Sequence, residues 1–83
     1  MNKIIVEVFV PALGKSYDIF ITENIPMYEV LELIKKAITD LNSGLFKADE
    51  NTAICFHDDG TIININLSAY ELGIRNGSRL MLI

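Results

Sequence analysis

The alternation of apolar and polar residues predicts two strands at the start of the chain. Residues 4–10 and 17–22 are rich in Val, Ile, Tyr and Phe, which are favoured in strands. The short connection between them contains Pro11 and Gly14, and a glycine in a short connection is typical of a hairpin. We therefore expect an antiparallel β-hairpin in this part of the chain.

The spacing of the apolar residues then changes from two to three or four, which predicts a helix over residues 27–41. Pro26 suits the first turn of a helix, and the residues 42–44, Asn-Ser-Gly, are typical of a helix end. Glu32 precedes Lys36 by four residues, a spacing that stabilises a helix. The predicted buried face consists of Met27, Val30, Leu31, Ile34, Ile38 and Leu41.

Short elements follow the helix. Residues 52–57 read as a strand that ends in an Asp-Asp-Gly turn, and residues 61–67 as a short half-buried strand. In the second of these, Ile63, Ile65 and Leu67 alternate with two asparagines and are expected to point inward. Ser68 can cap one helical turn over residues 68–72, and residues 78–83 form a last apolar strand.

The element order, two strands, helix, strand, short strand, turn and strand, resembles the ubiquitin-like β-grasp fold. We thus expect an α+β domain in which a mixed four- to five-stranded sheet packs on one α-helix. The closing segment 67–83, LSAYELGIRNGSRLMLI, is similar to the last third of ubiquitin-like domains. Its form LGIRNGSRLMLI is similar to the YukD/EsaB branch, the small bacterial ubiquitin-like proteins associated with type VII secretion.

In such a two-layer fold, one face of the sheet stays free of the helix. Taking polar residues such as Glu7 and Asp18 as outward, pleat alternation places Val6, Val8, Val10, Tyr17, Ile19, Ile21, Ile54, Phe56, Leu80 and Leu82 inward. The apolar residues then left on the outward face are Ile5, Phe9, Phe20, Cys55, Met81 and Ile83. Our hypothesis is a docking surface for a protein partner or for a second copy of the chain, with Phe20 and Met81 as anchors. The alternative is a scatter of ordinary strand residues.

Charge and composition narrow the class of partner. The chain has 83 residues, enough for one domain over 1–83, and its 7 Lys and Arg against 11 Asp and Glu give a net charge of −4. This balance argues against nucleic acid and against anionic membrane surfaces. One cysteine allows no internal disulfide, and we find neither a membrane-spanning run nor a signal peptide. We expect a cytoplasmic protein without direct membrane insertion.

Few residues suggest chemistry. His57 beside Asp58 and Asp59 is better explained as the end of a strand and a turn, because a metal site needs three or four converging ligands. Cys55 and His57 share a strand face, but a convex sheet offers no substrate pocket. The segment 73–78, GIRNGS, lacks the lysine and the spacing of a phosphate-binding loop. We therefore expect no enzymatic activity, no cofactor and no metal.

The resemblance implies a non-enzymatic accessory or regulator that binds components of the type VII secretion apparatus through its sheet face. Ubiquitin and the sulfur carriers act through a flexible C-terminal Gly-Gly, whereas this chain stops at Leu82-Ile83 inside a predicted strand, so conjugation is not expected. Two alternatives remain. In the first, the chain is an excised N-terminal domain of a larger secretion membrane protein. In the second, it is a modifier or sulfur carrier whose tail was removed.

Overall fold

The hairpin forms as the sequence predicts. The structure is a computed structural model that describes residues 2–44 and 46–83, so the first residue of the predicted domain and residue 45 lie outside it. Strand β1 spans Lys3–Val10 and pairs antiparallel with β2, Lys15–Thr22. The tight turn between them is closed by a hydrogen bond from Leu13 N to the Val10 carbonyl, 3.0 Å.

The main helix, α1, spans Met27–Leu41 and buries the face that the spacing predicts, except at its end. Leu41 is exposed, because the helix ends there, at the edge of the core. Pro26 is the N-cap residue rather than part of the first turn. At the other end, the Asn42 side-chain amide donates to the Ile38 carbonyl, 2.8 Å, which helps to end the helix.

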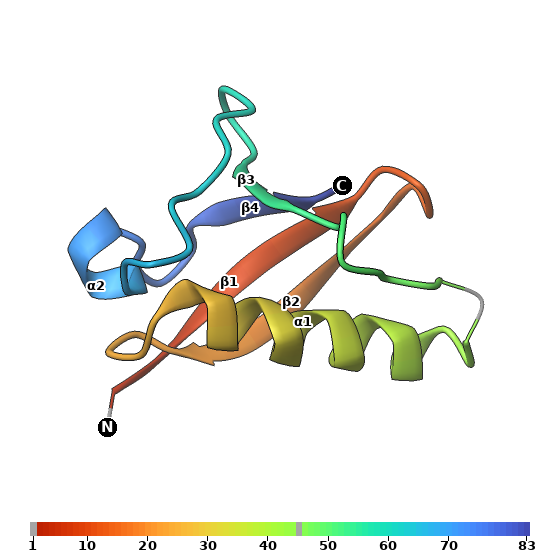
Figure 1. Cartoon of the computed structure of the whole chain (residues 1–83), viewed down its shortest axis with the longest axis horizontal. Helices are drawn as coiled ribbons and strands as arrows, with labels where there is room; N and C mark the ends of the chain where they lie inside the picture. The colour runs from red at the N-terminus through yellow and green to blue at the C-terminus, as the bar shows by residue number, and fades with distance from the viewer. Residues whose placement is uncertain (1, 45) are drawn as a thin grey trace.

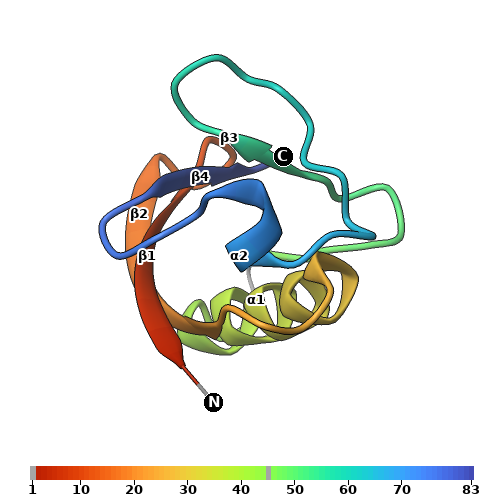
Figure 2. The same cartoon turned by 90° about the vertical axis from the view of Figure 1, so that its left-hand side faces the viewer.

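The remaining elements are β3, Ile54–Phe56, the short helix α2, Ala69–Leu72, and β4, Arg79–Leu82. Within the described residues, four strands form one sheet in the order β2-β1-β4-β3. Strand β4 runs parallel to β1 and antiparallel to β3, so the sheet is mixed. Helix α1 lies across one face of this sheet, and α2 lies near the N-terminal end of α1 (Figures 1 and 2). The expected α+β fold is confirmed.

The core lies between α1 and the inward face of the sheet. The inward residues of the two central strands are fully covered: Val6, Val8, Val10, Leu80 and Leu82. Tyr17 and Ile19 of β2 are only half-buried. Strand β2 is at the edge of the sheet and has a neighbour on one side only, which leaves the flank of its side chains open.

The predicted strand over residues 61–67 is wrong for most of its length. Ile62 makes an isolated bridge with Cys55, and the chain then leaves the sheet. The cause is local, because the Asn64 side-chain oxygen accepts a hydrogen bond from Asn66 N, 3.1 Å, and turns the backbone. Ile65 therefore lies at the surface with 38% of its area exposed.

The predicted cap of the next turn is confirmed as a reciprocal pair. The Ser68 hydroxyl accepts a hydrogen bond from Glu71 N, 3.1 Å, and the Glu71 carboxylate accepts one from Ser68 N, 3.0 Å. This capping box starts α2. Helix α2 ends at Gly73, whose backbone is left-handed with φ 76°, and β4 follows a second turn.

Candidate functional site

The face of the sheet opposite α1 carries the predicted docking residues, and the strand register shows how they lie. Ile5 on β1 is opposite Phe20 on β2. Phe9, further along β1, is opposite Met81 on β4, which is opposite Cys55 on β3. Because directly paired residues point to the same face, these five predicted residues share one face of the sheet. The sixth, Ile83, follows directly after the end of β4 at Leu82.

A charged row divides this face into two parts. Glu7 lies between Asp18 and Arg79 in the register, and the Arg79 guanidinium extends the row by donating to the Asp58 carboxylate, 2.6 Å. From strand rise and spacing, Phe20 and Met81 are about 16 Å apart across this row. The single surface expected from the sequence is therefore two patches.

We call these the Phe20 patch and the Met81 patch. The Phe20 patch consists of Ile5 and Phe20, and the Phe20 side chain is 69% exposed. The Met81 patch consists of half-buried Phe9 and Met81 together with Ile83, which is 55% exposed, and Ile62, which is 67% exposed. Apolar side chains this exposed on a sheet face are typical of an interaction surface.

Cys55 lies on this face, but the prediction that it is exposed is wrong. Its exposed fraction is 0%, because Met81 flanks it on one side and Ile62 on the other in the register. Burial raises the pKa of the Cys55 thiol, which lowers its reactivity because the thiolate is the nucleophile. Sequence reasoning missed Ile62, although its alternation with the inward Ile63 was the signal that could have placed it.

His57 has a structural environment rather than a catalytic one. Its ring meets Phe9 edge-on with the ring centres 5.5 Å apart. Its Nδ1 is 3.8 Å from the Asp58 carboxylate, which Arg79 holds at 2.6 Å. Across the part of the chain that the structure describes, no three His, Cys, Asp or Glu side chains gather in a group able to hold a metal ion.

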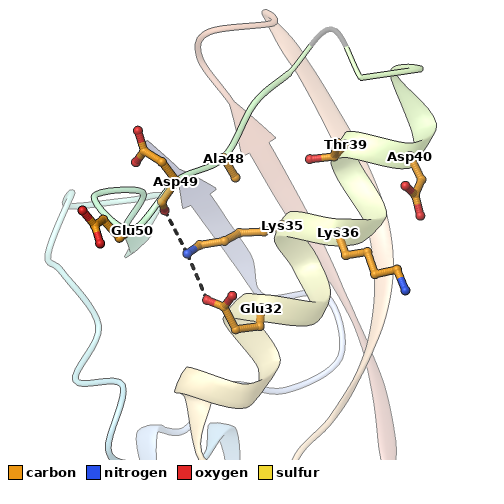
Figure 3. A pocket seen from close by; sticks show the side chains of 8 residues that line it. All are labelled: Glu32, Lys35, Lys36, Thr39, Asp40, Ala48, Asp49 and Glu50. Carbon is orange, nitrogen blue, oxygen red and sulfur yellow. Dashed lines mark hydrogen bonds and ion pairs between the residues drawn. The ribbon is translucent and has the colours of Figure 1, made fainter.

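A polar cleft of about 500 Å³ lies between the outer side of α1 and residues 48–50 (Figure 3). Lys35 reaches across it, and its Nζ donates to the Glu32 carboxylate, 2.9 Å, and to the Asp49 carbonyl, 3.0 Å. The Lys35 side chain is 13% exposed. This lysine fastens the loop to the helix, so we assign the cleft a structural role.

Comparison with known proteins identifies the fold. The sequence matches no family model and no curated protein. Among solved structures, it is similar to the ubiquitin-like domain of the type VII secretion protein EccD1 from Mycobacterium tuberculosis, with a TM-score of 0.79 and 16% identity over 100% of this chain and 99% of that chain.

Two other structures give the range of proteins that share this fold. A chain of the MycP5-free ESX-5 inner membrane complex matches with a TM-score of 0.71 and 19% identity over 100% of this chain and 21% of that chain. A chain of the toluene 4-monooxygenase HD complex with the inhibitor 4-bromobenzoate matches with a TM-score of 0.77 and 12% identity over 98% of this chain and 96% of that chain. These likenesses confirm the predicted ubiquitin-like fold, and the finer YukD/EsaB assignment stays a prediction. Among the described residues, neither helix has the length and apolarity to cross a membrane.

Proposed function

We propose that this chain is a non-enzymatic, ubiquitin-like protein-interaction module. In this proposal it is a cytoplasmic accessory or regulatory component of a bacterial type VII secretion system. It acts by non-covalent binding through the sheet face opposite α1.

The observation that carries the proposal is the Met81 patch. Ile62 and Ile83 expose more than half of their area. Ile62 bridges to Cys55, whose register partner Met81 alternates along β4 with the buried Leu80 and Leu82. Exposed apolar side chains flanked by charged residues, here Arg79 and Asp58, are typical of protein interfaces. The Phe20 patch offers a second anchor point on the same face.

The link to secretion rests on two observations. The closing segment 67–83 is similar to the YukD/EsaB form. The fold is also shared with the EccD1 domain and with part of a chain in the ESX-5 inner membrane complex. The net charge of −4 favours a partner that is neutral or basic at the contact.

The second candidate is the same fold as one domain of a larger secretion membrane protein. It is favoured by the ESX-5 match, in which a domain of this size makes up 21% of the chain. Reading the gene beyond the codon for Ile83 separates the two, and a Gly-Gly there would instead indicate a modifier or a sulfur carrier.

The test is affinity capture of the tagged protein from cells of its source organism, with one variant for each patch. Phe20→Asp and Ile83→Asp alter exposed positions on the sheet face, so both variants should fold. Tyr70→Asp is the matched control, because Tyr70 is 71% exposed and lies on α2.

We expect wild type and Tyr70→Asp to capture secretion components, and at least one sheet-face variant to lose them. Equal capture by all four proteins would refute the sheet face as the binding surface. Captured proteins with no relation to secretion would refute the proposed process, and a covalent adduct in the intact mass of the captured chain would refute non-covalent action.

A further inference from the structure

A second apolar surface lies beside α1 and meets the Met81 patch at Ile62. The backbone of residues 65–67 is fastened to the first turn of the helix, since Tyr28 N donates to the Ile65 carbonyl, 2.9 Å, and Met27 N to the Leu67 carbonyl, 2.8 Å. These bonds place Ile65 next to Tyr28. The Tyr28 side chain nevertheless remains 49% exposed.

Between these two residues lies a hollow of about 430 Å³ that we call the α1 groove. It runs between the first half of α1 and the segments 50–54 and 62–65, and its lining is mainly apolar, with Leu31, Ile54 and Ile63 among its buried members. Its size is in the range of binding pockets, roughly 300–1,000 Å³. The two hydrogen bonds join residues 65 and 67 to the start of α1 and so fix these two walls of the groove to each other.

The α1 groove continues past Tyr28 into a shallower hollow of about 330 Å³. Ile25 and Leu33 line that hollow, and Leu33 is an exposed leucine on the helix surface. Tyr28 is therefore a ridge with an apolar depression on each side. A partner that places apolar side chains in both depressions would enclose the tyrosine ring, which is a common anchor at interfaces.

The charges around the groove specify the partner. Glu32 and Glu50 line the groove itself, and Glu29 lines the neighbouring hollow. The cation in the groove lining, Lys35, already binds Glu32 and the Asp49 carbonyl. Among the described residues, Glu29 and Glu50 take part in no ion pair, so the rim keeps a net negative charge.

We propose that the α1 groove binds a basic, amphipathic segment of a partner protein. Leu, Ile or Phe side chains of that segment enter the groove and the neighbouring hollow, while its Lys or Arg side chains meet Glu29 and Glu50. The acidic rim repels nucleic acid and anionic lipid, which leaves a protein segment as the occupant. Ile62 lines this groove and also belongs to the Met81 patch, so the two surfaces are told apart by residues that belong to one of them only: Glu50 and Ile65 for the groove, Phe20 and Ile83 for the sheet face.

The test is selection from a displayed library of random 12-residue peptides on the immobilised full chain, followed by synthesis of the enriched sequence. We expect enrichment of Lys and Arg together with Leu, Ile or Phe. In NMR spectra of the ¹⁵N-labelled protein, the synthetic peptide should shift the amides of Tyr28, Glu50 and Ile65. Affinity should fall as salt rises.

Two pairs of variants separate the groove from the sheet face. Ile65→Ser should weaken binding of the peptide about tenfold, whereas Phe20→Ser on the sheet should not. Glu50→Lys should weaken it roughly fivefold, whereas Asp18→Lys, the same charge reversal on the sheet face, should leave it within twofold. Circular dichroism checks that each variant is folded.

Each of the following results would overturn the proposal. The library yields no enriched peptide, or the enriched peptides are acidic or uncharged. Alternatively, the peptide shifts amides of the sheet face in place of the groove, or Glu50→Lys binds it as tightly as wild type.

Discussion

Cys55 gives the sharpest test of how the outward face is arranged. It is sealed between Met81 and Ile62 in the register, so cutting back Ile62 should uncover it. We predict that Ile62→Ala raises the rate of Cys55 alkylation by iodoacetamide in the native protein more than tenfold. Burial raises the pKa of the thiol, so the native alkylation rate should level off at a higher pH than that of an ordinary exposed thiol.

The expected size of the effect separates local uncovering from unfolding. Ile62 buries only about a third of its area, and full burial of an isoleucine contributes roughly 1.5–3 kcal/mol. The substitution should therefore destabilise the fold by about 0.5–1 kcal/mol, which raises the unfolded population roughly two- to fivefold. A rate increase above tenfold exceeds what unfolding supplies.

Ile65→Ala is the matched control, because it makes the same change three residues beyond Ile62, the residue that bridges to Cys55. Ile65 buries more of its area than Ile62 does, so this variant should be destabilised at least as much. Its alkylation rate should follow stability alone. If Cys55 reacts no faster in Ile62→Ala than in Ile65→Ala, Ile62 does not cover Cys55 and does not belong to the Met81 patch.

Three further predictions concern stability, measured by urea unfolding. Ser68→Ala removes the hydroxyl of the capping box and should lower the free energy of unfolding by about 1 kcal/mol. The control is Ser16→Ala at an exposed position, which should leave the free energy of unfolding nearly unchanged. Equal losses in the two variants would contradict the role of the cap. Gly73→Ala should lower it by about 1–2 kcal/mol, because the backbone there has φ 76° in open space and the loss is purely conformational. Hydrogen bonds from Thr61 lower the pKa of Asp59 in the folded protein. The ionised Asp59 carboxylate therefore stabilises the fold above about pH 4, and this stabilisation is lost as the pH falls through the pKa that Asp59 has in the folded state. Asp59→Asn should flatten this acid decline, and an unchanged pH profile would refute the assignment.

The elements with a strong local pattern were predictable from the sequence. Two β-rich runs around a glycine turn predict the hairpin, and apolar residues at helical spacing predict α1. The hairpin depends on contacts between residues close in the chain, and α1 depends on one continuous apolar face along the helix. The cap at Ser68 was readable for the same reason, because its partner Glu71 is three residues away.

The segment 61–67 was not predictable from alternation alone. Its apolar and polar residues alternate as in a strand, but the Asn64 side chain competes by bonding Asn66 N and turns the backbone. This turn at Asn64 decides where Ile65 lies. Because Ile65 lines the α1 groove, the groove could not be predicted from the sequence either. The alternation of apolar and polar residues does not show which side chains will bond to the nearby backbone and form a turn.

The candidate site was only half predictable. Parity along each strand correctly assigned Phe20 and Ile83 to the outward face, but it carries no information on what lies beside a residue on the next strand. The register across strands placed Glu7 and Arg79 between the two patches and closed Met81 and Ile62 around Cys55. Exposure of a sheet residue is therefore a tertiary property.

Site-specific photo-crosslinking in living cells would test the proposed interaction most directly. A benzophenone amino acid is placed in turn at positions 20, 83 and 70, which all expose more than half of their area. If the sheet face binds a secretion component, crosslinks to that protein should form from position 83, from position 20, or from both, and not from position 70 on α2. Crosslinks from position 70 alone, or crosslinks from the sheet face only to proteins outside secretion, would contradict the proposed function.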